Sequence, residues 1–220
     1  MASRETGLAQ PSVRRHRLTA RGAATRARIV ESAADLMFAR GVAGTSLDDV
    51  IDASSTSKSQ VYHYFADKDD LVRAVIAHQT DRVLTAQEPH LHQLDSMLGL
   101  RSWRDDIVDR QRRRHGVGGC PVGSLASELA DHSEASRTLL AESFRTWEQH
   151  LVRGLERMRD RGQLLPDTHP PALASAIMAA LQGGLLLAQT TRTTAPLERS
   201  LDMALEHVEH RTTRPSASRT

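Results

Sequence analysis

Residues 45–71 read TSLDDVIDASSTSKSQVYHYFADKDDL, and this stretch decides what kind of fold the chain adopts. Ser46 is followed three residues later by Asp49, and Ser57 is followed three residues later by Gln60. This spacing is typical of a helix N-cap and the side chain that returns a hydrogen bond to it. The two pairs therefore predict two short helices, and the serines and threonine between them predict a tight polar turn.

Helices of this length need a longer partner, because isolated helices of fewer than about 12 residues are marginal in water. The partner is predicted to begin near Thr19 or Thr25 and to end at Gly41, since Ile29, Ala33, Leu36 and Met37 recur with helical spacing. Three helices arranged in this way form a helix-turn-helix unit. Such a unit can insert its third helix into a DNA major groove about 12 Å wide.

The end of the same stretch carries a specific motif. Ser57-Lys58 is followed by Tyr62-His63-Tyr64-Phe65-Ala66-Asp67-Lys68. On these residues, positions 25–75 resemble the DNA-binding region of the TetR family of bacterial transcriptional regulators. The resemblance implies an all-α fold, with an N-terminal three-helix helix-turn-helix domain and a C-terminal helical ligand-binding and dimerisation domain.

Two positions depart from the pattern of the family, which commonly has Gly at position 55 and often at position 59. Ser55 is therefore expected to adopt the left-handed conformation that Gly takes freely, at a cost of about 1 kcal/mol. Ser59 and Gln60 are expected to change which bases are read. Gln60 can pair with adenine in the major groove, whereas a serine discriminates less between bases.

Hydroxyl, amide and cationic side chains in this region can bond to phosphates and base edges. For Ser46 and Ser57 the alternative is that they only cap helices, and for Tyr64 and Phe65 it is that they belong to the core. The predicted DNA contacts are Thr45, Ser46, Ser57, Lys58, Ser59, Gln60, Tyr62, His63, Tyr64 and Lys68.

Positive charge is concentrated at the start of the chain. The formal net charge is only +2, yet residues 1–28 contain seven arginines and a single acidic residue, Glu5. We predict that residues 1–18 form a flexible basic arm that meets a polyanion, with a solubilising tail as the alternative.

The composition favours an all-helical protein, because only 3% of residues are aromatic and runs of β-branched residues are scarce. The single Cys120 excludes an internal disulfide and a cysteine zinc cluster, which favours the cytoplasm. No stretch approaches the roughly eighteen consecutive apolar residues of a membrane span. We expect no membrane association, no cofactor and no bound metal, the pair His207 and His210 included.

Beyond Asp67, which is expected to cap a helix running toward Pro89, the chain continues to show helical patterns. Further helices are predicted over 103–115, 123–132, 133–161 and 172–189, followed by a last one that contains Leu197 to Val208. The glycine cluster before Cys120 lacks the Lys-Ser/Thr ending of a P-loop and follows no strand, which argues against nucleotide binding.

The segment Gly119–Glu128, GCPVGSLASE, resembles a signature in the C-terminal domain of one TetR branch, which includes regulators of drug-resistance and flavonoid-responsive genes. That resemblance implies a role in shaping a ligand cavity. Cys120 is either a small packing residue or a redox sensor. The predicted ligand-binding residues are Trp103, Ile107, Cys120, Leu125, Phe144 and Trp147.

The last two helices combine small residues with leucines, which allows close helix approach. In the TetR family two such helices pair with those of a second subunit, and an ordinary internal core is the alternative. The predicted dimer interface consists of Leu173, Ile177, Leu181, Gly184, Leu185, Leu197, Leu201 and Leu205.

The sequence therefore predicts a ligand-responsive repressor that binds a palindromic operator as a homodimer and is released by a small apolar or aromatic effector. A non-inducible or activating regulator is the alternative. An enzyme is not expected, because Ser124 and His132 have no third catalytic group. The predicted divisions are the arm 1–18, the DNA-binding domain 19–67, the ligand-binding and dimerisation domain 68–212, and a flexible tail 213–220.

Overall fold

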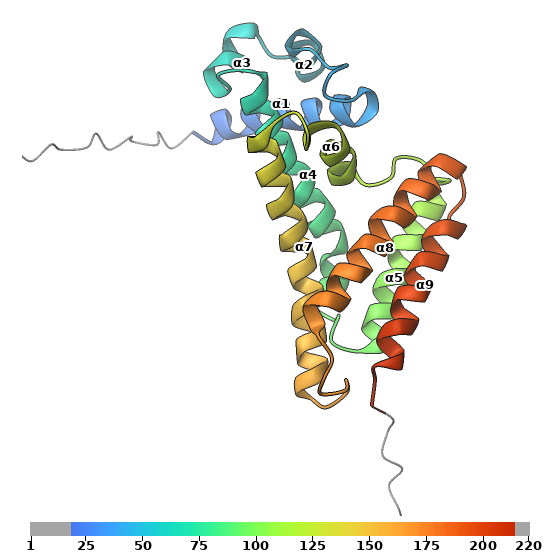
Figure 1. Ribbon diagram of the computed structural model, residues 1–220. Helices are drawn as coiled ribbons and strands as arrows, with labels where there is room; N and C mark the ends of the chain where they lie inside the picture. Colours follow the sequence, from blue (N-terminus) through green and yellow to red (C-terminus); the bar gives the residue numbers. More distant parts are fainter. Residues whose placement is uncertain (1–18, 214–220) are drawn as a thin grey trace, which may run out of the picture.

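The computed structural model describes residues 19–213, and within this range the protein is all-α, as predicted (Figure 1). The described part contains nine helices and one isolated β-bridge, between Leu164 and Thr212. The predicted basic arm 1–18 and residues 214–220 of the predicted tail lie outside the described residues. The helices are α1 (Ala20–Arg40), α2 (Leu47–Ser54), α3 (Lys58–Tyr64), α4 (Lys68–Leu91), α5 (Met97–Arg113), α6 (Pro121–Leu129), α7 (Glu134–Asp160), α8 (Pro170–Thr191) and α9 (Ala195–His210).

Both predicted capping boxes are present in the helix-turn-helix unit. The Ser46 hydroxyl accepts from the Asp49 amide at 3.1 Å, and Asp49 accepts from the Ser46 amide at 2.8 Å. The Ser57 and Gln60 pair repeats the arrangement at 3.3 and 2.9 Å. The starts of α2 and α3 are therefore fixed by local hydrogen bonds, as the sequence predicts.

The turn between α2 and α3 contains the predicted backbone conformation. Ser55 ends α2 with φ 50° and ψ 44°, in the left-handed region, and its amide bonds back to Asp52 and Ile51. Gly41 at the end of α1 also has a positive φ of 79°, but its ψ of 165° lies outside the left-handed helical region that was predicted. The chain thus leaves α1 in an extended direction.

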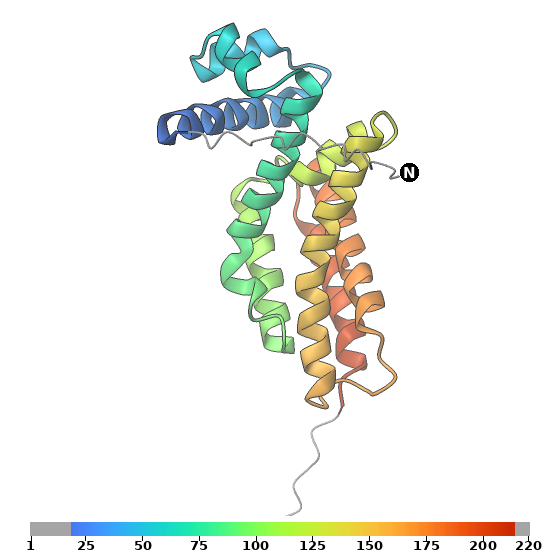
Figure 2. The same ribbon diagram turned by 90° about the vertical axis from the view of Figure 1, so that its left-hand side faces the viewer.

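Helix α4 connects the helix-turn-helix unit to the rest of the protein. Its N-terminal half packs on α1, and the helix then continues alongside α7 and α5 (Figures 1 and 2). Asp67 caps it as predicted, accepting from the Asp70 amide at 2.7 Å. The helix was expected to end near Pro89 but continues to Leu91, because a proline in the last turn removes only one hydrogen bond.

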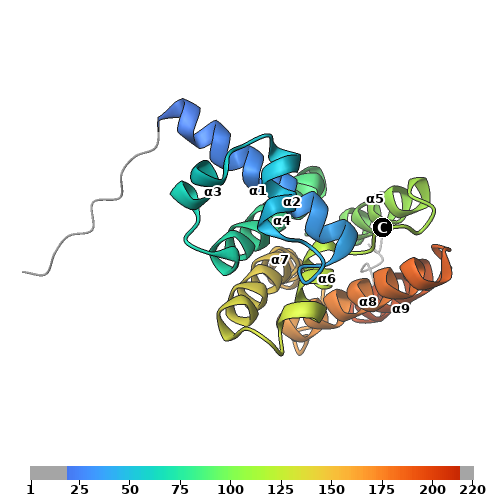
Figure 3. The ribbon, with the colours of Figure 1, turned by 90° about the horizontal axis from the view of Figure 1, so that it is seen from above.

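The C-terminal bundle consists of the rest of α4 together with α5 to α9. Helices α8 and α9 pack closely on each other, α7 packs on α8 and α4, and α5 contacts α9 (Figures 1 and 3). Trp103 is fully buried and donates from Nε1 to Gln87 Oε1 at 2.8 Å. The core is continuous from the helix-turn-helix unit into this bundle.

The residues predicted to form the dimer interface are instead buried within their own chain. All eight are enclosed by the bundle, and Leu181, Leu197 and Leu201 are 0% exposed. Gly184 is where α8 and α9 approach most tightly, since a Cβ there would lie 2.8 Å from the Leu197 Cα. The prediction was wrong for this stripe because the same spacing of leucines serves contact between α8 and α9 of one chain.

Helix α8 also corrects the expectation about membrane spans. It has no charged residue and is long and apolar enough to cross a membrane by length and composition alone, although 44% of its most apolar window is buried in the bundle. The core helix of a bundle meets the same criteria, so length and composition alone do not make α8 a membrane span.

The strained turn residue gives a stability prediction. Ser55→Gly should raise the free energy of unfolding by about 0.5–1 kcal/mol, because Gly adopts the left-handed conformation without a Cβ clash. Urea unfolding of Ser59→Gly provides the matched control. That change inserts Gly inside α3 and should lower the stability by about 0.5–1 kcal/mol. Equal effects of the two substitutions would contradict the prediction.

Candidate DNA-contacting surface and effector cavity

Helix α3 lies at one end of the molecule, away from the far end of the C-terminal bundle (Figures 1 and 2). Its buried face consists of Val61 at 0% and is continued by Phe65 at 2% exposure. The outer face is formed by Lys58, Ser59, Gln60, Tyr62 and His63, all of which are exposed. Five of the ten predicted DNA contacts are therefore brought together on one exposed side of α3.

Helix capping occupies part of the hydrogen-bonding capacity of this surface. Gln60 Oε1 accepts from the Ser57 amide, which uses one of the two lone pairs of this oxygen. The Ser57 and Ser59 hydroxyls lie 3.1 Å apart. A bidentate contact from Gln60 to adenine uses both ends of the amide group, so the side-chain oxygen would have to serve the cap and the base together or leave the cap.

Three other predicted contacts lie in less open positions. Thr45 is 1% exposed and donates its hydroxyl to the Gly41 carbonyl at 2.8 Å, so it is removed from the predicted surface. Tyr64 is half-buried, with its ring edge-on to His63. Lys68 Nζ donates to the Val42 carbonyl at 2.6 Å, so Lys68 holds the α1–α2 loop in place.

The α1–α2 loop is also held from the bundle side. The carboxylate of Glu128, near the end of α6, accepts from the Val42 amide at 2.8 Å and from the Ala43 amide at 2.6 Å. Charged acceptors make stronger hydrogen bonds than neutral ones. The peptide groups of the loop are therefore bonded by α4 on one side and α6 on the other.

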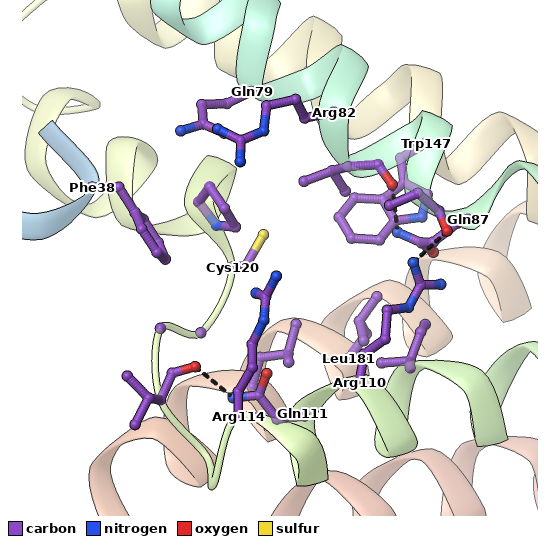
Figure 4. Close-up of a pocket in the computed structure, with 18 of the residues that line it drawn as sticks. Phe38, Gln79, Arg82, Gln87, Arg110, Gln111, Arg114, Cys120, Trp147 and Leu181 are labelled. Carbon is purple, nitrogen blue, oxygen red and sulfur yellow. Dashed lines mark hydrogen bonds between the residues drawn. The ribbon is translucent and has the colours of Figure 1, made fainter. Parts of the chain in front are cut away.

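The bundle contains a cavity of about 590 Å³, which we call the Trp147 cavity. Helices α4, α5, α7 and α8, the loop before α6, and α1 all contribute to its lining. Figure 4 shows Arg82 of α4 and Arg114 after α5 extending toward each other across the space, with Phe38 and Cys120 at one side and Trp147 at the other. A cavity of this size accommodates a small organic ligand.

The predicted ligand-binding residues are only partly brought together. Ile107, Cys120 and Trp147 line the Trp147 cavity. Phe144 lines a separate open groove of about 970 Å³ between α6, α7 and α8. Leu125 borders a small cavity of about 150 Å³, and Trp103 lies behind the lining, bonded to Gln87.

The sequence prediction missed the polar side of the cavity. Its lining includes Arg82, Arg110 and Arg114 together with the buried glutamines Gln79, Gln87 and Gln111. Arg110 and Arg114 are four residues apart, so helical spacing alone indicated a shared face. Nothing in the sequence indicated that this face meets Arg82 of another helix.

Cys120 caps α6, with its sulfur accepting from the Gly123 amide at 3.3 Å. Burial raises the pKa of its thiol above the ordinary value, more than the hydrogen bonds from neighbouring groups lower it. A reactive cysteine needs a lowered pKa and access to solvent, so this environment favours the packing role over the redox-sensor alternative.

The open face of α8 consists of Ala179, Gly183 and Leu186, which border the groove between α6, α7 and α8. Leu186 is 62% exposed, and a Cβ placed on Gly183 would meet nothing within 4 Å. Met203 on the neighbouring helix α9 is 67% exposed. An apolar strip therefore remains uncovered on the side opposite the buried leucines.

Comparison with known proteins identifies the family. Residues 29–75 match the model described as "Bacterial regulatory proteins, tetR family", and residues 98–204 match "Tetracyclin repressor-like, C-terminal domain". An uncharacterized HTH-type transcriptional regulator in the lacX 3' region of Lactococcus lactis is 31% identical over 187 residues, covering 81% of this chain and 90% of the relative. The chain belongs to the TetR family.

Other TetR-type relatives include proteins named as repressors. The repressor NemR of Escherichia coli K12 is 27% identical over 193 residues, covering 84% of this chain and 92% of NemR. The solved structure of reduced E. coli NemR aligns with a TM-score of 0.67 at 25% identity, covering 88% of this chain and all of that one. A TetR-family regulator from Cytophaga hutchinsonii aligns with a TM-score of 0.78 at 20% identity, covering 90% and 100%, which shows the shared fold.

This TetR-family protein is therefore a helix-turn-helix transcriptional regulator and not an enzyme. The expectation from residues 25–75 is confirmed by the family match over residues 29–75. The match over the C-terminal domain confirms the family there as well, without identifying a branch.

The contact between α6 and the α1–α2 loop of this TetR regulator can be tested by amide hydrogen exchange. Glu128→Gln should accelerate exchange at Val42 and Ala43 by at least about tenfold, because a neutral amide group replaces a charged acceptor with two strong bonds. Asp131→Asn is the control, since Asp131 is exposed. Unchanged exchange at both amides in the Glu128 variant would show that the bonds do not persist in solution.

Proposed function

We propose that this protein is a ligand-responsive transcriptional repressor of the cytoplasm. It binds a palindromic operator as a homodimer and is released by a small effector with a largely apolar or aromatic body. The observation that carries the proposal is the Trp147 cavity, which is bordered both by the bundle and by Asp35 and Phe38 of α1. Relatives named as repressors support this direction of regulation.

On the DNA side, α3 acts as the recognition helix. Lys58 meets a phosphate from its first turn, Ser59 and the free amide nitrogen of Gln60 face base edges, and Tyr62 and His63 lie toward the backbone. Ser46 and Ser57 serve mainly as caps, with their exposed hydroxyls beside the phosphates. Lys68 contributes through the loop it holds and through its remaining N–H donors.

In the dimer, the open face of α8 packs against its symmetry mate, with Met203 of α9 at the margin. Small residues at positions 179 and 183 allow two copies of the helix to approach closely. This assignment replaces the leucine stripe expected from the sequence. Two-fold symmetry then sets the separation of the two α3 helices and explains a palindromic operator.

Helix α6 connects the cavity to the DNA-binding unit. Cys120 and Pro121 at its start line the Trp147 cavity, and Glu128 near its end holds the α1–α2 loop. A ligand that favours a different position of α6 would move this loop and with it α3. To reverse operator occupancy from 99:1 to 1:99, the effector must prefer the released state by about 5.5 kcal/mol.

The proposed function can be tested with DNA from upstream of the protein's own gene. Fluorescence anisotropy should show binding to one palindromic site that is at least about a thousandfold tighter than to random DNA. Small organic compounds are then screened for release. Equal affinity for all sequences would refute operator binding, and specific binding that no compound reverses would favour the non-inducible alternative.

Lys58 provides a test of the phosphate contacts. Lys58→Ala should weaken binding to operator and random DNA alike and reduce the salt slope of each by about one unit per subunit, because one fewer counterion is released. Arg145→Ala on α7 removes an exposed positive charge far from α3 and should leave the slope unchanged. A slope unaffected by Lys58→Ala would remove this residue from the surface.

The dimer face can be tested by sedimentation equilibrium. Leu186→Asp should shift the protein to monomers and weaken operator binding, because a carboxylate would be buried at the two-fold axis. Leu98→Asp is the matched control, since Leu98 is 79% exposed at the start of α5. A Leu186→Asp protein that remains dimeric would place the interface elsewhere.

A further inference from the structure

The Trp147 cavity has an excess of positive charge. Arg82, Arg110 and Arg114 line it, against a single carboxylate, Asp35. Their guanidinium groups come from two different segments, α4 and the end of α5, and Figure 4 shows them around one central space. Positive groups that converge from separate elements into one cavity form a site for an anion.

Two of the three arginines have carboxylate partners of their own. Arg82 bonds to Asp35 at 3.0 Å, in an exposed pair that joins α4 to α1. Arg110 bonds to Asp106 and to the Ala86 carbonyl. Because each of these two guanidinium groups already has a carboxylate partner, its attraction for a further anion is reduced.

Arg114 has neither a salt bridge nor a side-chain hydrogen bond to any residue in the range 19–213. Its backbone ends α5, and its side chain extends into the cavity (Figure 4). Of the three arginines in the cavity lining, Arg114 is therefore the one whose charge is not paired with a carboxylate of residues 19–213. Arg114 is exposed, whereas Arg110 is half-buried.

The pKa of Arg110 reflects its burial and the positive charges near it. Burial, followed by the positive charges of Arg113 and Arg114, lowers the pKa of its guanidinium. A ligand anion beside Arg110 and Arg114 would relieve this repulsion. The electrostatic gain would be larger than at an open surface, because Arg110 is half-buried.

Part of the cavity lining is apolar. It includes Trp147 at 4%, Leu181 at 0% and Leu185 at 7% exposure, together with Ile107 of α5. A ring or short hydrocarbon segment packed on these side chains would gain about 25 cal/mol per Å² of apolar surface removed from water. The cavity thus combines charged and apolar lining side chains.

Building on the proposed function, we propose that the effector is an organic oxyanion, with a carboxylate or equivalent head held by Arg114 and Arg110 and an apolar body against Trp147, Leu181 and Leu185. This narrows the effector from a generally apolar or aromatic molecule to an amphiphilic acid. Neutral molecules of the same shape bind more weakly, because they have no anionic oxygen and therefore make no charge-assisted hydrogen bond to Arg114.

The test uses matched pairs of an acid and its neutral ester. 2-Naphthoate, 3-phenylpropanoate and decanoate are each titrated beside their methyl esters by calorimetry, with quenching of tryptophan fluorescence as a second readout. At least one acid should bind with saturation below about 1 mM and at least about tenfold more tightly than its ester. Esters that bind as well as or better than their acids, or no binding by any acid, would overturn the proposal.

Arg114→Ala identifies the site, with Arg113→Ala as its control. Both residues are exposed and adjacent at the end of α5, but Arg113 does not line the cavity. Arg114→Ala should lower acid affinity by about tenfold and leave ester affinity and the unfolding midpoint unchanged, whereas Arg113→Ala should change none of these. Equal loss in the two variants would show a diffuse charge effect and not the proposed site.

Operator release separates this proposal from the proposed function. Acids that bind in the cavity and dissociate the operator complex support both. Acids that bind but leave DNA binding unchanged support the anion site and contradict ligand-responsive repression. Release by an ester and not by its acid supports the responsive repressor and overturns the oxyanion assignment.

Discussion

The backbone of Val42 links the helix-turn-helix unit to the C-terminal bundle, and the placement of the DNA-binding helices depends on this link. Its carbonyl accepts from Lys68 of α4, and its amide donates to Glu128 of α6, 86 positions away along the chain. Backbone groups in a buried or half-buried loop need partners, and here both partners come from outside the loop. The direction in which the chain leaves α1, and hence the placement of α2 and α3, is therefore set jointly by the helix-turn-helix unit and the bundle.

Helix α6, which holds this loop through Glu128, also lines the Trp147 cavity at its start. Helix α1 borders the same cavity through Asp35 and Phe38. The cavity accordingly lies between the two functional parts of the protein. A ligand shifts a conformational equilibrium only by the difference in its affinity for two states. A cavity with walls from both parts can supply such a difference, because relative movement of α1, α6 and the bundle changes its shape and the distances among its charges.

Local hydrogen bonding made much of the DNA-binding unit predictable. Ser46, Ser57 and Asp67 cap the helices they were expected to cap, and Ser55 adopts the expected left-handed conformation. The same chemistry limited the prediction of function. Gln60 was assigned both a capping and a base-reading role, and the structure shows that the cap uses its side-chain oxygen. Thr45 looked available in sequence but is enclosed by packing that no spacing of residues reveals.

The sequence by itself determined the helices, the turn, the family and the region that contacts DNA, since these follow from hydrogen bonds and side-chain periods within a few residues. Only the tertiary structure decided which face of α8 is covered. That helix is apolar around most of its circumference, so its pattern does not distinguish Leu181, buried against its own chain, from Leu186, exposed to solvent. Tertiary structure likewise placed Arg82 in the same cavity lining as Arg110 and Arg114, because a cavity joins residues from helices whose relative positions depend on packing of the whole bundle.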